Sequence, residues 1–521
     1  MMVYTRKSPA LLVIGIVMFA IWWATTSGLL APVISFLLID KKYSNELATL
    51  PLYFGLIAIV IGILVWGIKQ KEGNVDYILG TAAGGMFILL IAMLVRWFVA
   101  PVVALLGTML GKVGETGKYI HELLGLNYVV IGIIAGILIV NVFKIPGWAE
   151  HGIRLARLAL KTGVILLGTL YSLAELQQLG KLSFILIGVF VLGSVGIVLW
   201  LSKRRKVSHS MGGVLSAGIG VCGVSATVAA APVVKAKSVE IAYTIGTILL
   251  WGVGCMFVFP IIGNLLDMGH VQFGAWAGTG ILNSAQVAGA ALAFQPDGIE
   301  TLKVAEIFNI TRVLFLPVIV LWLALWYVKQ EQTTTDVNVG LVVIEKFPVF
   351  VLGFILMFAL SSTGIFAPAN HYKGKYFDNN VSEDKLLTNE QLSVLFSESS
   401  KVEREDRQKA LVRLIENRKV MSIEDDDAIR GLVNAAILSK QANRILKSAH
   451  KNVRHSAKKI KKFRQWITWL FAFGLVGLGM QITVSAMKQA GGQPAVIGGV
   501  VGILKAVLSL LVVLMFVEET I

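Results

Sequence analysis

Residues 217–231 read AGIGVCGVSATVAAA, and residues 277–291 read AGTGILNSAQVAGAA. Each stretch is a glycine-rich break followed by small residues. With one residue gapped, the matching pairs are Ala217 and Ala277, Gly218 and Gly278, Gly220 and Gly280, Ser225 and Ser284, Ala226 and Ala285, Val228 and Val287, and Ala229 and Ala288. This pattern is typical of discontinuous helices, which occur as repeated elements in secondary transporters. We therefore predict two discontinuous, Gly-rich helices related by an internal repeat.

The surrounding sequence is that of a membrane protein. The chain has 521 residues, of which 56% are hydrophobic and 15% charged, and its mean hydropathy is +0.76. A soluble domain carries about a quarter charged residues. Runs without Asp, Glu, Lys or Arg cover 8–39, 47–68, 77–95, 123–143, 182–202, 210–234, 241–266, 271–296, 347–370 and 465–487. Shorter runs lie at 97–111, 162–174, 313–328 and 506–517, and each is long enough to span the membrane if a flanking ionisable residue is included.

A transmembrane helix needs about 20 apolar residues. These runs therefore predict an all-α, polytopic protein with roughly 12–13 transmembrane helices, in the cell membrane and most simply a bacterial inner membrane. We divide the chain into N-terminal extra spans (1–122), a main transport body (123–370), a hydrophilic insertion (371–465) and C-terminal spans that complete the body (466–521). Apolar residues recur at helical spacing within the insertion, which is therefore predicted to be mostly helical. The basic cluster at 458–464, directly before the next span, favours a cytoplasmic position for the insertion.

A second internal similarity has a longer period. GVILLGTLYSLAELQQLG (163–180) resembles GLVGLGMQITVSAMKQAG (474–491), so that Gly163 and Gly168 correspond to Gly474 and Gly479. An odd number of predicted spans separates the two segments, so they would run in opposite directions, as in an inverted-topology repeat. The alternative is chance similarity between two Gly-rich membrane helices.

The Gly-rich breaks suit an anion. A break leaves backbone N–H groups without partners, the positive end of the following half-helix favours negative charge, and glycine permits close approach. The candidate binding residues of the first break are Gly218, Gly220, Cys222, Gly223, Ser225 and Thr227. Those of the second are Gly278, Thr279, Gly280, Asn283, Ser284 and Gln286. The alternative is that Gly, Ala and Ser only allow close helix packing.

Ionisable residues are rare within the predicted spans, and each is a functional candidate. Arg312 could add positive charge to the anion site, or could simply snorkel from a helix end. Glu306 and Asn309 precede it on the same predicted helix and are candidates for coupling. The two cysteines, Cys222 and Cys255, suit neither a disulfide framework nor a metal site. We expect no metal and no cofactor, and the absence of HExxH, GxSxG and Walker motifs predicts a protein that is not an enzyme.

The net charge of +16 indicates contact with anionic lipids and basic loops that obey the positive-inside bias, rather than nucleic-acid binding. Basic clusters lie at 203–206 and 458–464. The predicted spans place these clusters on opposite faces, so the sequence does not fix the orientation of the chain. The expected partners are a small anion, a coupling ion (Na+ or H+), anionic lipids and, in a homodimer, a second copy.

Several stretches resemble the YeiH-type sulfate exporter family. They include LALKTGVILLGTLYSLAELQQLG, GVCGVSATVAAAPVVKAK, FGAWAGTGILNSAQV, ITRVLFLP, FPVFVLGFILMF and GLVGLGMQ, and the resemblance covers about 126–366 and 466–517. It implies the fold of the bile-acid/sodium symporter and cation–proton antiporter superfamily, with inverted repeats and discontinuous helices that cross near the midplane. The chain departs from the family pattern at Leu282 and Asn283, where members carry a His-Asp pair, and at Asn309, where they often carry lysine. The extra N-terminal spans and the insertion also depart from it.

Three functions follow as hypotheses. The first is a secondary transporter of a small, sulfate-like oxyanion that binds between the two Gly-rich breaks. The second is an anion channel of the same fold, which the missing titratable pair favours. The third is a membrane sensor that signals through the 371–465 insertion.

Overall fold

The computed structural model describes residues 9–36, 41–67, 74–111, 119–143, 150–171, 173–296, 299–331, 349–367, 377–402, 405–435, 438–454, 457–488 and 492–517. Regular structure in these residues is helical, and an isolated antiparallel bridge pairs Asp378 with Arg454. The predicted all-α, polytopic class is confirmed. The chain divides into two compact units, one formed by 1–167, 178–355 and 466–521 and the other by 168–177 and 356–465.

The helices of the first unit are α1 (Ala10–Thr26), α2 (Ala31–Phe36), α3 (Lys41–Gly67), α4 (Asn74–Leu94), α5 (Ala100–Met109), α6 (Ile120–Leu123), α7 (Tyr128–Leu138), α8 (Glu150–Leu167), α9 (Leu173–Arg204), α10 (His209–Gly220), α11 (Val224–Ala230), α12 (Ser238–Leu265), α13 (His270–Gly280), α14 (Ser284–Phe294), α15 (Glu300–Leu314), α16 (Leu316–Glu331), α24 (Val484–Lys488) and α25 (Gly492–Phe516). The second unit holds α19 (Asn389–Glu398), α20 (Glu405–Asn417), α21 (Ile423–Ala435) and α22 (Lys440–Asn452). Helices α18 (Val349–Ser362) and α23 (Lys458–Gly479) have residues in both units, and so does α9, of which residues 173–177 belong to the second unit.

In the part of the chain described, six helical stretches are long and apolar enough to cross a membrane. They are Glu46–Ile63, Tyr77–Met109, Leu179–Arg204, Ser238–Leu265, Glu300–Glu331 and Gly492–Phe516. Shorter apolar helices lie at Ala10–Thr26, Tyr128–Phe143, Ser284–Phe294 and Val349–Ser362. The runs 77–95 and 97–111 form one stretch because a π-helical segment, Val95–Val99, joins α4 to α5. The runs 210–234 and 271–296 each fold into a pair of short helices rather than one spanning helix.

The 163–180 and 474–491 similarity coincides with a reciprocal helix contact. A β-carbon at Gly163 of α8 would lie 2.8 Å from Phe471 Cε2, and one at Gly474 of α23 would lie 2.6 Å from Leu160 Cγ. Leu160 and Phe471 correspond at the same offset as Gly163 and Gly474. In each helix, the glycine of the aligned pair therefore contacts the residue that lies three positions before the other glycine. A local two-fold axis between the helices requires this reciprocity. This contact supports the inverted repeat.

Helices α10 and α11 form a helical hairpin whose turn is 221–223. A β-carbon at Gly218 would lie 2.5 Å from Thr227 Oγ1, whereas nine residues of continuous helix would separate the two by roughly 13 Å. Farther from the turn, a β-carbon at Gly213 would lie 2.8 Å from Val234 Cγ1. These nested contacts show that the chain reverses direction.

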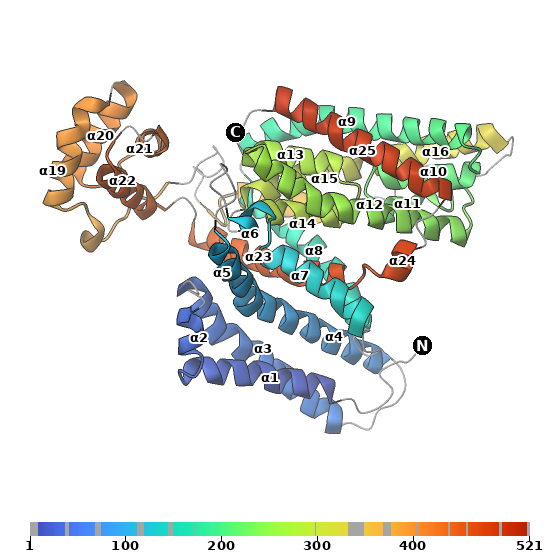
Figure 1. Cartoon of the computed structure of the whole chain (residues 1–521), viewed down its shortest axis with the longest axis horizontal. Coiled ribbons are helices and arrows are strands. Elements are labelled where there is room, and N and C mark those ends of the chain that lie inside the picture. The colour runs from blue at the N-terminus through green and yellow to red at the C-terminus, as the bar shows by residue number, and fades with distance from the viewer. Residues whose placement is uncertain are drawn as a thin grey trace. The chain divides into compact units, whose positions relative to one another are not determined.

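Helices α13 and α14 form a second helical hairpin, with its turn at 281–283. The rings of Phe273 and Phe294 stack with centroids 4.0 Å apart. At the open end, Gln295 Nε2 lies 3.3 Å from His270 Nε2. The first residue of α13 is thus adjacent to the residue that follows α14. Figure 1 shows this hairpin beside α15, on which α13 packs.

The two hairpins approach each other from opposite ends of α12. Glu240, in the first turn of α12, binds the open end of the first hairpin, and a β-carbon at Gly263, near the last turn, would meet Phe273 of the second. The turns lie near the middle of α12, where Ile248 packs on Gly218 and Gln286 packs on Gly252. Opposite approach is the arrangement expected of inverted structural repeats.

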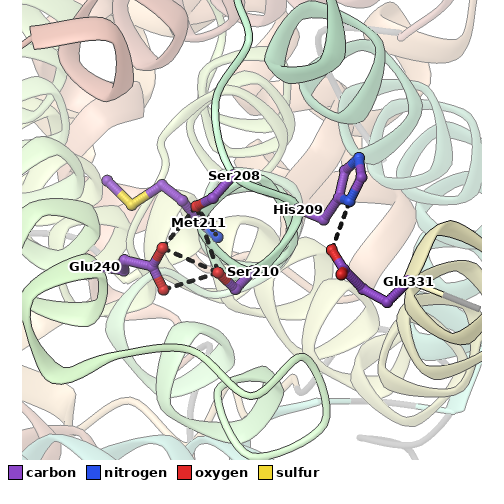
Figure 2. Close-up of polar contacts among 6 residues, drawn as sticks. All are labelled: Ser208, His209, Ser210, Met211, Glu240 and Glu331. Atoms are coloured by element: carbon purple, nitrogen blue, oxygen red, sulfur yellow. Dashed lines mark hydrogen bonds and ion pairs between the residues drawn. The ribbon is translucent and has the colours of Figure 1, made fainter. Parts of the chain in front are cut away.

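Side-chain hydrogen bonds close the open end of the first hairpin (Figure 2). The Glu240 carboxylate accepts a hydrogen bond from Ser208 Oγ at 2.6 Å and from Ser210 Oγ at 2.9 Å. His209 Nδ1 lies 2.7 Å from Glu331 Oε1 at the end of α16. Ser208 also caps α10 by accepting a hydrogen bond from the Met211 N–H. These contacts tie the hairpin to both α12 and α16.

The second unit has a hydrophobic core of its own. Buried residues of α19 to α22 form it, and they include Leu395, Leu411, Ile429 and Leu446. The Arg413 guanidinium donates hydrogen bonds to the buried Asp425 carboxylate, and these hydrogen bonds raise the pKa of Arg413. The helical insertion anticipated at 371–465 is therefore a folded helical cluster over its described residues.

We predict that Gly474→Ala lowers stability by about 1–3 kcal/mol, because the added methyl would overlap Leu160 and lie 3.1 Å from the Ala156 carbonyl. Gly193→Ala is the matched control, since a β-carbon there meets nothing within 4 Å. Thermal unfolding of the purified proteins in detergent measures both changes. Equal melting temperatures for the two variants would contradict the reciprocal contact.

Candidate functional site at the hairpin tips

The turns of the two hairpins meet, and we call residues 221–223 and 281–283 the hairpin tips. All six residues are buried. Gly223 has φ +80° and ψ −125°, a conformation that is open essentially to glycine alone. A β-carbon at Gly223 would lie 3.1 Å from Asn283 Cβ and 3.2 Å from its Cα. Glycine is therefore required both by the turn and by the close approach of the second tip.

Helix α14 begins at the second tip. Asn283 is its N-cap, and the side-chain oxygen accepts a hydrogen bond from the Ala285 N–H at 3.3 Å. Helix α11 begins at the equivalent place after Gly223, which has no side chain to cap it. The structural correspondence is therefore Gly220 with Gly280 and Gly223 with Asn283, without the gap used in the sequence comparison. The structural counterpart of Ser284 is accordingly Val224 rather than Ser225.

Arg312 lies against the second tip. Its side chain is fully buried, and its Nη1 donates a hydrogen bond to the Ile281 carbonyl. Its Nη2 donates to Asn309 Oδ1 at 3.0 Å, and Asn309 Nδ2 donates to Glu306 Oε2 at 3.0 Å. Residues 306, 309 and 312 share one face of α15 because they are spaced by three. The structure thus brings the three predicted residues together, and Arg312 is buried rather than snorkelling.

Lys505 lies against the first tip. It is 3% exposed, and its Nζ donates to the carbonyls of Ile219 and Gly220 at 3.3 and 3.4 Å. It comes from α25, which also contacts the second tip through Gly502 and Leu282. Among the described residues, no carboxylate lies within ion-pair distance of Lys505.

The buried ionisable residues at the tips carry an excess of positive charge. Arg312 and Lys505 supply two formal positive charges and Glu306 one negative charge, which leaves +1. Burying net charge is costly unless an opposite charge compensates it. Within the described residues, no group of three or more His, Cys, Asp or Glu side chains could hold a metal ion. The tips therefore suit an anion.

The other predicted glycines pack against neighbouring helices. β-Carbons at Gly218 and Gly220 would meet Ile248 and Val195, and β-carbons at Gly278 and Gly280 would meet Phe308 and Phe259. This is the contact that the packing alternative describes. Gly223 differs, since it faces the opposite hairpin tip.

The predicted polar residues fall into two groups. Thr227 and Thr279 donate to carbonyls of their own helical segments, Gly223 and Ala275, so their hydroxyl protons are already engaged. Ser225 is exposed, and Cys222 is buried within electrostatic range of Arg312. By contrast, three side chains have buried atoms without a hydrogen-bond partner among the described residues. These atoms are Ser284 Oγ, both amide atoms of Gln286, and Arg312 Nε.

Lys505 is the tip residue that the sequence reasoning did not select. Its signal was available: it is an ionisable residue near the middle of the apolar stretch 492–516. Treating 506–517 as the span placed Lys505 at a flank, where lysines commonly snorkel. In the helix it lies well inside, because α25 begins at Gly492.

Comparison with known proteins matches this chain to a family model and to several membrane proteins that share one name. A family model described as "Conserved hypothetical protein 698" matches residues 86–375. A "UPF0324 membrane protein" of Nitratidesulfovibrio vulgaris is 34% identical over 406 residues, which cover 77% of this chain and 87% of the relative. A second protein of that name from the same organism is 38% identical over 280 residues (53% and 77%), and one from Streptococcus agalactiae is 31% identical over 247 residues (46% and 72%). No solved structure gives a significant match.

We predict that Gly223→Ala destabilises the protein by more than the roughly 1–3 kcal/mol that an unfavourable backbone conformation costs, because its methyl must also displace Asn283. Gly28→Ala is the matched control, with φ +81° and nothing within 4 Å of a β-carbon. Thermal unfolding in detergent provides the comparison. If both substitutions lower the melting temperature equally, the contact between the tips contributes nothing to the stability of the protein.

Proposed function

This chain belongs to the membrane-protein family described as "Conserved hypothetical protein 698", and from that premise we propose that it is a secondary transporter of a small inorganic anion. The observation that carries the proposal is the burial of two cationic side chains, Arg312 and Lys505, at the tips, where Glu306 is the one buried carboxylate on the Arg312 helix. The proposed substrate is a sulfate-like oxyanion, bound between the two hairpin tips. The resemblance to the YeiH-type sulfate exporters supports the same substrate class.

The polar atoms without partners supply the proposed hydrogen bonds. Ser284 Oγ and Gln286 Nε2 lie in the first turn of α14, where helical N–H groups also favour an anion. Arg312 Nε is a third donor. An oxyanion accepts several hydrogen bonds at once and could use all three.

Two hairpins that approach from opposite ends of α12 support a carrier rather than an open pore. Each tip covers the other, so movement of either hairpin would expose the tips to one side only. The inverted α8–α23 contact is consistent with alternating access between two related halves. The channel alternative predicts passive conductance that follows the anion gradient alone.

Reconstituted vesicles test the function directly. The purified protein should take up radiolabelled sulfate or a related oxyanion above the rate of empty vesicles, and an excess of the unlabelled anion should compete. Reversal potentials measured at varied proton and sodium gradients separate a carrier from a channel. Absence of uptake for sulfate, sulfite, thiosulfate, phosphate and nitrate would refute the proposal.

We predict that Ser284→Ala weakens apparent anion affinity roughly tenfold, because a hydrogen bond to a charged group contributes about 1.5–3 kcal/mol. Ser225→Ala should have a smaller effect, since the Ser225 side chain is exposed rather than buried at the tips. Concentration-dependent uptake or isothermal titration gives both affinities. Unchanged affinity in Ser284→Ala would exclude this serine as a ligand.

A further inference from the structure

The first helix of each hairpin ends at a tip with buried carbonyl groups. The last four carbonyls of a helix lack partners within it, and the C-terminal end carries partial negative charge. Helix α10 ends at Gly220 and helix α13 ends at Gly280, and both residues are buried. With water excluded, such carbonyls require hydrogen-bond donors or cations.

Each hairpin tip has its own side-chain cation. Lys505 Nζ binds the Ile219 and Gly220 carbonyls, and Arg312 Nη1 binds the Ile281 carbonyl. The two cations come from different helices, α25 and α15. The arrangement is therefore repeated in space, with one cation for each hairpin.

Discontinuous helices commonly bind coupling ions at such places. In secondary transporters, unwound backbone carbonyls and the C-terminal ends of half-helices coordinate Na+ or support proton binding. Here the covalently attached Lys505 ammonium occupies the carbonyl end of α10, and the Arg312 guanidinium occupies the carbonyl that directly follows α13. Neither has a carboxylate within ion-pair distance among the described residues. Backbone carbonyls hold Lys505, and the Ile281 carbonyl together with Asn309 Oδ1 holds Arg312.

We propose that Lys505 and Arg312 are tethered substitutes for coupling cations, so that this protein moves its anion without binding Na+ or K+ at the tips. The statement that the anion moves without Na+ or K+ rests on the proposed transport function. The statement that side-chain cations bind the tip carbonyls in place of free ions does not, and it can be tested without measuring transport.

Lys505 is the better residue for the test, because both of its hydrogen bonds go to one helix end. Lys505→Ala removes the ammonium and leaves space beside the Ile219 and Gly220 carbonyls. We expect the melting temperature of the purified protein to fall by about 3 °C or more, and ethylammonium chloride or NaCl at tens of millimolar to recover at least half of that loss. Choline chloride at equal concentration controls for ionic strength, since choline is too large to enter.

Control variants separate charge from packing. Lys329→Ala, at an exposed position near the end of α16, should melt like the parent and show no rescue. Lys505→Met keeps the aliphatic volume without the charge, and should be destabilised but not rescued, since the space is filled. If Lys505→Ala cannot be purified, Lys505→Met is compared with Lys505→Arg, which should remain closer to the parent.

Two results would overturn the inference. One is a Lys505→Ala protein that melts at the same temperature as the parent or, where Lys505→Ala cannot be purified, a Lys505→Met protein that does so. The other concerns anion uptake by the parent protein when N-methylglucamine replaces both Na+ and K+. We expect the uptake rate to stay within twofold of the rate with Na+ and K+ present, and loss of uptake would contradict the inference. If the parent moves no anion, the transport proposal fails alone, and the melting experiments still decide the tethered-cation inference.

Discussion

The architecture of the tips depends on one constraint, which is that backbone carbonyls at a helix end cannot be buried without a partner. Each hairpin reverses direction inside the protein and so creates such an end. Lys505 donates to the Ile219 and Gly220 carbonyls at the end of α10, Arg312 donates to the carbonyl of Ile281, which directly follows α13, and Asn283 caps α14. Without these side chains, burial of the two reversals would cost several unsatisfied polar groups. Lys505 and Arg312 therefore bind buried backbone carbonyls as well as being candidate anion-binding residues.

Helix α12 gives the hairpins their common frame. Because its 28 residues extend from the open end of one hairpin to the open end of the other, the tips meet near its midpoint. Small residues make this meeting possible: Gly252 accommodates Gln286, and Gly223 accommodates Asn283. The glycines that pack helices and the glycine that forms the turn thus have different roles within one motif. Packing and site formation are complementary here, whereas the sequence presented them as alternatives.

Much of this arrangement could be predicted from the sequence, for identifiable reasons. Glycine-rich breaks are local features, so the breaks at 218–223 and 278–280 could be predicted from composition. Arg312 stood out because charged residues are rare in apolar segments. Chain reversal could not be predicted, because it depends on contacts such as the Phe273–Phe294 stack, whose partners are brought together only by folding. Lys505 was missed because its depth depends on where α25 begins, and helix boundaries are the least reliable feature of a sequence reading.

The charge balance at the tips bears on what such a site can select. A formal charge of +1, set by Arg312, Lys505 and Glu306, favours any anion over any neutral solute, whatever its shape. A monovalent anion brings the sum to zero, and a divalent anion reverses it to −1. In the proposed anion site, charge would account for discrimination between classes of solute, and discrimination among anions would have to come from hydrogen-bond geometry. Ser284 and Gln286, whose buried polar atoms have no partner among the described residues, are the side chains available for that second task.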